Sequence, residues 1–201
     1  MILRRHYTWL TLLTALIIPG RADAHLVNTG FGPFYDGISH LFVTAPDLLV
    51  VVALGLLAGM RGKATSRGML LAITLAWSIG GVMGLTFAPA ITWAVATTVS
   101  FLLLGALLAL DRDLSRSTII VIAVAVGLTH GFLNGAESAA SGIGLVGFTG
   151  SVAALAVMAT LTTALAVSFA NGAARIALRV AGSWIAAIGI LMLGWLFRSG
   201  V

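Results

Sequence analysis

Six apolar runs constrain this chain more than any other feature of its sequence, because most of them are long enough to cross a lipid bilayer as helices. The runs cover residues 41–60, 69–86, 91–110, 118–135, 145–170 and 180–197. Only 8% of the residues are charged and 60% are hydrophobic, whereas about a quarter of a soluble domain is charged. The sequence therefore predicts an all-α, polytopic membrane helix bundle of about six transmembrane helices, forming a single domain over residues 25–201.

The first 24 residues have the pattern of a secretory signal peptide. Arg4 and Arg5 precede a short apolar run over residues 7–18, and an A-x-A sequence ends at Ala24. Cleavage after Ala24 would leave His25 as the first residue of the mature protein. A free α-amine and an imidazole on one residue can chelate a metal together, so His25 is a candidate ligand. Alternatively, the run remains as an uncleaved helix and His25 is a solvated loop residue.

The basic residues lie between the apolar runs, and their distribution predicts the orientation of the bundle. With the mature N-terminus outside, the connections after the first, third and fifth runs face the cytoplasm. These connections contain Arg61, Lys63, Arg67, Arg112, Arg116, Arg175 and Arg179. Cytoplasmic connections are enriched in Lys and Arg, and a secretory signal independently gives the same orientation. We expect a multi-pass protein of a bacterial inner membrane, whose net charge of +5 reflects topology and not a nucleic-acid partner.

The number of runs and the spacing of their glycines also predict how the helices are arranged. Two sets of three spans would lie antiparallel in the membrane, which is the inverted-repeat plan of many transporters. Glycines four residues apart, such as Gly80 and Gly84 or Gly131 and Gly135, let helix backbones approach closely. We therefore expect a tightly packed bundle of two inverted three-helix halves.

Two polar groups interrupt the apolar runs, and in each a carboxylate follows a histidine by seven residues. They are Asp36, His40 and Asp47, before and inside the first run, and His130, Asn134 and Glu137, at the end of the fourth run. Offsets of four and seven residues share one face of a continuous helix. With the expected topology both groups lie toward the outer side of the membrane, so we expect them to meet there.

Imidazole and carboxylate groups together suit divalent ions such as Ni²⁺, Co²⁺, Zn²⁺ and Cu²⁺. Ionisable residues at membrane depth are costly and usually face the bundle interior or water. Cysteine is absent, which excludes thiolate ligands and cysteine nucleophiles. We therefore predict a site for a divalent cation and no tightly bound cofactor. Its candidate ligands are His25, Asp36, His40, Asp47, His130, Asn134 and Glu137.

Structural roles for some of these residues stay open at this point. Asp36 could cap a helix, for which Asp is well suited, and Asn134 could simply occupy a helix end. His130 and Glu137 could pair only with each other. The enzyme motifs G-x-S-x-G, H-E-x-x-H and the P-loop are absent from the sequence. A serine–histidine–acid set can be assembled on paper from Ser138 or Ser141, but only their proximity in sequence supports it.

With these residues identified, the chain resembles the HupE/UreJ family of hydrogenase and urease accessory membrane proteins. The resemblance rests on an opening H-L-V-N-T-G-F-G-P-F-Y-D-G that follows the predicted cleavage site and leads to His40, and on a first run that ends in L-G-L-L-A-G. It also rests on His130-Gly131, followed by Glu137 and then by Gly147-Phe148.

The resemblance implies a small six-span permease for nickel or cobalt that serves the maturation of metalloenzymes, and thus maturation proteins as partners. In the family's two motifs, which are similar to H-P-x-x-G-x-D-H and H-G-x-x-H-G-x-E, His40, His130 and Glu137 match. Asp47 and Asn134 stand where the family has histidines. Two other functions remain open. One is a membrane electron-transfer protein with His40 and His130 as axial haem ligands, and the other is an accessory or assembly factor that does not transport.

Overall fold

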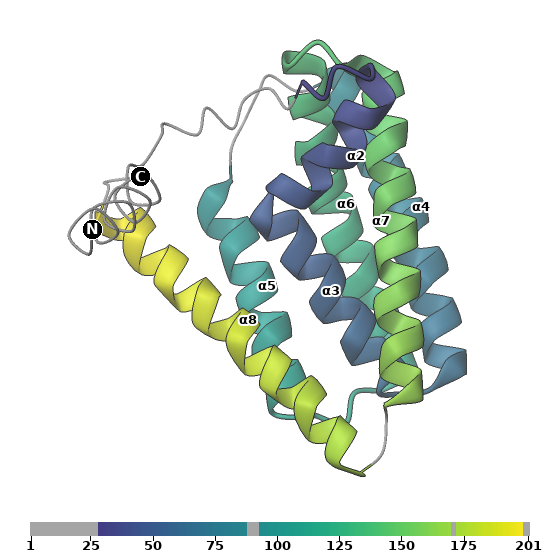
Figure 1. Ribbon diagram of the computed structural model, residues 1–201, viewed down its shortest axis with the longest axis vertical. Helices are drawn as coiled ribbons and strands as arrows, with labels where there is room; N and C mark the ends of the chain where they lie inside the picture. The colour runs from purple at the N-terminus through teal and green to yellow at the C-terminus, as the bar shows by residue number, and fades with distance from the viewer. Residues whose placement is uncertain (1–27, 88–92, 170–171, 199–201) are drawn as a thin grey trace, which may run out of the picture.

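The computed structural model describes residues 28–87, 93–169 and 172–198, and this part of the chain consists of seven α-helices without strands. The helices are α2 (Pro33–Val43), α3 (Ala45–Gly59), α4 (Lys63–Phe87), α5 (Ala94–Ala109), α6 (Arg116–Ala140), α7 (Gly144–Ser168) and α8 (Gly172–Arg198). They form the bundle drawn in Figure 1, which confirms the all-α prediction. The predicted signal peptide, residues 1–24, and His25 lie outside the described residues.

Four of the helices, α4, α6, α7 and α8, are long and apolar enough to cross a membrane. The short helices α2 and α3 pass the same test as a pair, with a bend of 74° between them. Helix α5 is also apolar, but its 16 residues fall short of a full span. Four to five membrane spans therefore follow from length and composition among the described residues, and the count of six stays a prediction.

The first apolar run is not the continuous helix that we expected over residues 41–60. Thr44 has non-helical backbone angles and separates α2 from α3. Pro46 explains the break, because its ring would clash with the carbonyl group four residues earlier and it has no N–H to donate. Pro46 instead occupies the first turn of α3, where no such hydrogen bond is needed. The prediction that Asp47 shares one helix face with His40 is therefore wrong.

Other helices extend beyond the apolar runs that predicted them. Helix α6 continues to Ala140, so Glu137 belongs to this helix, although the apolar run that predicted it ends at residue 135. Helix α8 begins at Gly172, so Arg175 and Arg179 lie in its first turns and not in a loop. Apolar runs mark the lipid-facing length of a helix, whereas good helix formers such as alanine and arginine extend it past that length.

Glycine contacts bring α4 and α6 together along most of their length, and these two helices form the most extensive helix pair in the bundle. A Cβ atom added at Gly84 would lie on the Phe132 carbonyl oxygen, and one added at Gly131 would lie on the Trp77 carbonyl oxygen. Only glycine permits such an approach of two backbones. The close packing predicted from the four-residue glycine spacing is confirmed for this pair.

Helix α7 packs against α2 and α3 in the same way. A Cβ atom at Gly37 of α2 would lie on the Gly147 carbonyl oxygen, and one at Gly55 of α3 would lie on the Thr162 hydroxyl. The buried Ser151 hydroxyl donates a hydrogen bond of 2.8 Å to the Gly37 carbonyl oxygen. These contacts hold the bent α2–α3 segment on α7, although the break at Thr44 removes its helical continuity. Helix α8 packs mainly on α5, at the edge of the bundle (Figure 1).

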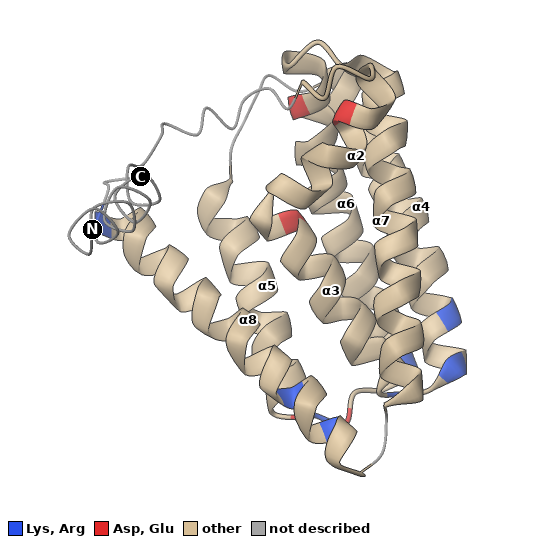
Figure 2. Cartoon of the chain, viewed as in Figure 1, with Lys and Arg blue, Asp and Glu red and all other residues tan. Residues whose placement is uncertain are grey.

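Most of the basic residues gather toward one end of the bundle (Figure 2). The connections α3–α4 and α5–α6 lie at one end, together with the end of α7 and the start of α8, and we call this the arginine end. It contains Arg61, Lys63, Arg67, Arg112, Arg116, Arg175 and Arg179. The opposite end contains α2, the C-terminus of α6 and the start of α7, and we call it the carboxylate end because Asp36 and Glu137 belong to it.

Candidate cation site

The centre of the site is a buried pair formed by Asp47 and His130. Asp47 lies in the first turn of α3, directly after the break at Thr44, and His130 lies in α6. The Asp47 Oδ1 and His130 Nδ1 atoms are 2.7 Å apart. The two residues are only 6% and 1% exposed. A buried carboxylate and a buried imidazole offset much of each other's desolvation cost when they are hydrogen-bonded.

The second ring nitrogen of His130 is also engaged. His130 Nε2 is hydrogen-bonded to the Ser100 hydroxyl of α5 at 2.8 Å, and that hydroxyl donates to the Thr97 carbonyl oxygen at 2.7 Å. The Trp77 ring of α4 stacks on the imidazole with a centroid distance of 5.8 Å. Four helices thus fix the ring. Ser100 was not identified from the sequence, because a single serine in an apolar run is common in membrane helices.

Asn134 lies one turn after His130 on α6 and contacts the same carboxylate. Its Nδ2 atom donates to Asp47 Oδ2 at 3.3 Å. The residue is 1% exposed, and its Oδ1 atom has no hydrogen-bond partner. Asn134 therefore does not occupy the end of its helix, which continues to Ala140. A buried, unpaired amide oxygen beside a carboxylate is an unusual feature that requires an explanation.

A second imidazole–carboxylate pair, His40 with Glu137, joins α2 to α6. His40 Nε2 lies 3.4 Å from Glu137 Oε2 and 3.4 Å from the Thr44 hydroxyl. The Glu137 side chain is 45% exposed, so this pair is far more accessible than the Asp47–His130 pair. The alternative in which His130 and Glu137 pair only with each other is wrong, because His130 contacts Asp47.

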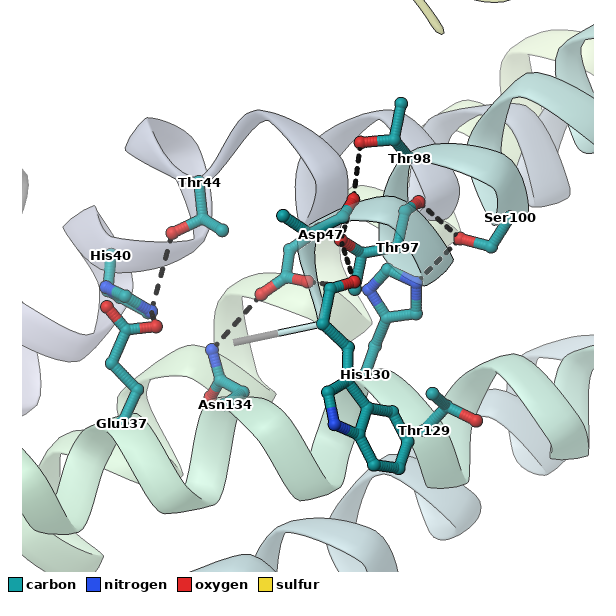
Figure 3. Close-up of polar contacts among 12 residues, drawn as sticks. His40, Thr44, Asp47, Thr97, Thr98, Ser100, Thr129, His130, Asn134 and Glu137 are labelled. Atoms are coloured by element: carbon teal, nitrogen blue, oxygen red, sulfur yellow. Dashed lines mark hydrogen bonds and ion pairs between the residues drawn. The ribbon is translucent and has the colours of Figure 1, made fainter. Parts of the chain in front are cut away.

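Asp36 contacts the segment that precedes α2. Its Oδ1 atom accepts hydrogen bonds from the Thr29 backbone N–H at 2.7 Å and from the Thr29 hydroxyl at 2.6 Å. The helix N-cap is Gly32, without a side-chain capping bond. Asp36 thus anchors the entry to α2 and is not the N-cap considered from the sequence. The structure brings other candidate residues together in two groups, His40 with Glu137 and Asp47 with His130 and Asn134, as Figure 3 shows.

A cavity of about 190 Å³ lies between the two pairs. It is lined by Thr44, Pro46, Asp47, Trp93, Ala94, Thr97, Leu133, Asn134 and Glu137. At a rise of 1.5 Å per residue, Glu137 lies roughly 5 Å from the end of α6 at Ala140 and His130 roughly 15 Å from it. The break at Thr44 matters here, since it turns the first residues of α3 toward this space. Polar residues from both groups, Asp47, Asn134 and Glu137, thus line a cavity whose other walls are largely apolar.

No three His, Asp or Glu side chains in the described part of the chain are grouped closely enough to hold a metal ion as they stand. The polar groups instead form two imidazole–carboxylate contacts at different depths. Each contact would have to open for its atoms to coordinate a cation. His40 and His130, the haem ligands considered from the sequence, each contact a carboxylate.

The Asp47–His130–Ser100 series has the order of groups found in serine hydrolases, and it differs from the Ser138 and Ser141 sets considered from the sequence. The Ser100 hydroxyl is not part of the cavity lining, and it is hydrogen-bonded to the Thr97 carbonyl group. A nucleophile must be within reach of its substrate. The series is therefore better explained as the support that fixes the imidazole beside Asp47.

A comparison with protein families matches the chain over nearly its whole length. A family model described as HupE / UreJ protein matches residues 13–192, which include every residue of both pairs. No curated protein and no solved structure matches the chain.

Proposed function

The chain belongs to the HupE/UreJ family, and from this premise we propose that it is a membrane permease for a divalent transition-metal cation, with nickel or cobalt as the cargo. The observation that supports this function is the pair of imidazole–carboxylate contacts at two depths around one cavity. Ionisable groups inside a membrane bundle are expensive and commonly mark an ion pathway.

The exposed pair is suited to capture. Glu137 is half exposed at the carboxylate end, and it supplies negative charge for the entering cation. As the cation approaches, His40 Nε2 and the Glu137 carboxylate exchange their mutual contact for contacts to the ion. His40 is thus proposed as a nitrogen ligand that attracts a transition metal over the alkali ions, since imidazole suits such metals.

The buried pair is suited to the next step. Asp47 lines the cavity, and the Asn134 amide lies beside its carboxylate. A divalent ion between these groups would lose much of its water, and the carboxylates would compensate its charge. His130 and Ser100 keep the Asp47 carboxylate oriented during the exchange. The two candidate ligands not included in this path are Asp36, which contacts Thr29, and His25.

The orientation that we propose puts the carboxylate end outside and the arginine end in the cytoplasm, in a bacterial inner membrane. The helix packing is consistent with two inverted halves. One half would contain α2–α3, α4 and α5, and the other α6, α7 and α8. If the halves are exchanged position by position, the packing of α2–α3 on α7 becomes the packing of α6 on α4, and the packing of α5 on α8 is unchanged. Release of the cargo inside would then follow from a movement of one half against the other.

The cation would supply the maturation of metalloenzymes, with their maturation proteins as partners on the cytoplasmic side. The proposal is tested by measuring total cellular metals by mass spectrometry, with and without expression of the chain. We expect expression to raise one transition metal, and His40→Ala and Glu137→Gln each to abolish the increase. Thr129→Val is the matched control on α6, because the Thr129 hydroxyl only donates to the Ala125 carbonyl oxygen of its own helix.

The amount of each variant in the membrane is measured in parallel, so that loss of transport is separated from loss of protein. Unchanged metal accumulation in both His40→Ala and Glu137→Gln, at normal membrane levels, would contradict the proposal. It would favour a non-transporting accessory factor of the same family.

A further inference from the structure

The orientation of the Asn134 amide follows from its neighbours. The Asp47 carboxylate can only accept hydrogen bonds when it is ionised, so the amide nitrogen must face Asp47 Oδ2, as it does at 3.3 Å. The amide oxygen then points away from that carboxylate and has no hydrogen-bond partner, although the residue is only 1% exposed. Asn134 also lines the cavity between the two pairs. A buried acceptor without a donor, beside a cavity and a carboxylate, is suited to accept a cation.

The nitrogen donors near this cavity are fewer than the sequence suggests. Both ring nitrogens of His130 are hydrogen-bonded, one to Asp47 and the other to Ser100. The ring is not part of the cavity lining. His40 is therefore the imidazole that can turn toward the cavity when its contact with Glu137 opens.

Oxygen donors are more numerous. The Asn134 amide oxygen, the Asp47 carboxylate and the Glu137 carboxylate all belong to residues that line the cavity. Carboxylate and carbonyl oxygens favour harder divalent ions such as Mn²⁺, whereas imidazole nitrogens favour Ni²⁺ and Cu²⁺. A site with one imidazole and three oxygen-bearing side chains would therefore discriminate poorly in favour of nickel.

We propose that Asn134 determines the specificity of this cation site, because its amide oxygen completes an oxygen-rich set with Asp47 and Glu137 that favours Ni²⁺ over the harder ion Mn²⁺ far less than an imidazole at this position would. This inference rests on the proposed function and names how the permease discriminates among transition-metal ions. Affinity for any site rises from Mn²⁺ through Co²⁺ to Ni²⁺, so the preference has to be measured as a change in the ratio of bound metals.

The test uses the purified full chain in detergent, dialysed against an equimolar mixture of Mn²⁺, Co²⁺ and Ni²⁺, with the bound metals counted by mass spectrometry. In Asn134→His an imidazole replaces the neutral oxygen, and the adjoining cavity offers it room. We expect the ratio of bound Ni²⁺ to bound Mn²⁺ to rise at least about tenfold over that of the unmodified chain. The Thr129→Val control keeps the original ratio.

A second variant protects the test from a folding defect of the larger side chain. Asn134→Ala adds no volume and removes the amide oxygen, so binding of Mn²⁺ and Co²⁺ is expected to weaken about tenfold or more. Gel filtration and circular dichroism identify the variants that keep their fold.

The possible outcomes distinguish a failure of the inference about Asn134 from a failure of the proposed transport function. The role of Asn134 is overturned if Asn134→His binds metal with a ratio of Ni²⁺ to Mn²⁺ within about twofold of the original. It is also overturned if Asn134→Ala binds Mn²⁺ and Co²⁺ as well as the unmodified chain does. Either result leaves the permease proposal unaffected. Failure of the unmodified, folded chain to bind any of the three metals overturns both.

Discussion

Asp47 and His130 are 83 residues apart in the chain, and yet Asp47 Oδ1 and His130 Nδ1 lie 2.7 Å apart in the bundle interior. The contact joins the first turn of α3 to the middle of α6. Because both groups are almost fully buried, the pair holds two helices together, and it also fixes the carboxylate of Asp47, a residue that lines the cavity. A change at either residue therefore affects stability as well as transport.

We expect Asp47→Ala to lower the stability of the protein in detergent by about 1–3 kcal/mol, since the buried His130 ring loses a hydrogen-bond partner. The unfolding transition is followed by circular dichroism. The double variant with His130→Ala should be less destabilised than the sum of the single variants, by about 0.5–3 kcal/mol of coupling. Purely additive effects would show that the two side chains do not interact.

The glycine contacts between α4 and α6 predict a large difference between two glycine-to-alanine substitutions. In Gly84→Ala the new methyl group meets the Phe132 carbonyl oxygen, and overpacking of this kind costs about 1–3 kcal/mol or more. The control is Gly194→Ala on α8, where nothing lies within 4 Å of the added Cβ atom and the helix gains propensity. Equal melting temperatures for the two variants would argue against the close α4–α6 packing.

An ion-pair cluster at the arginine end predicts a specific dependence of stability on pH. Asp111 Oδ2 accepts from Arg175 Nε at 2.6 Å, and Asp111 Oδ1 accepts from Arg61 Nη2 at 3.1 Å. The hydrogen bonds from Arg175 lower the pKa of the Asp111 carboxyl below its ordinary value, with the charges of Arg175 and Arg61 contributing. The contribution of ionised Asp111 to the stability of the fold is thus fully present above the ordinary pKa of about 3.9, and it is lost as the pH falls through the lowered pKa.

Melting temperatures of the unmodified chain and of Asp111→Asn, measured from pH 7 to pH 3, test this assignment. We expect the unmodified chain to be more stable by a constant margin between about pH 5 and pH 7, and the margin to shrink below about pH 4. A margin that grows as the pH falls would reverse the sign of the pKa change and contradict the ion pairing.

Much of the fold could be predicted because it depends on lipid as the solvent. Runs of apolar residues locate membrane helices, and each of the six runs has a counterpart among the helices. The contact between Asp47 and His130 could be expected from the topology, since the predicted topology puts both residues toward the same side of the membrane. Whether these groups bind a metal stays a prediction.

Local geometry was harder to predict. The bend at Thr44 depends on the clash that Pro46 would cause inside a continuous helix, and an apolar run gives no sign of whether a proline interrupts a helix or begins a new one. The choice of partners could not be predicted either, because His130 lies four residues from Asn134 and seven from Glu137 on its own helix. Its contacts with Asp47 and Ser100 depend on the packing of three helices.

The central claim is that a divalent cation passes the His40–Glu137 and Asp47 groups, and uptake into proteoliposomes tests it most directly. Purified protein is reconstituted, and the initial rate of Co²⁺ or Ni²⁺ entry is measured for the unmodified chain, Glu137→Gln, Asp47→Asn and the Thr129→Val control. We predict that the unmodified chain and the control take up metal at the same rate, and that both carboxylate variants are slower by about tenfold or more. Equal rates in all four, or rates no higher than in protein-free liposomes, would contradict the account.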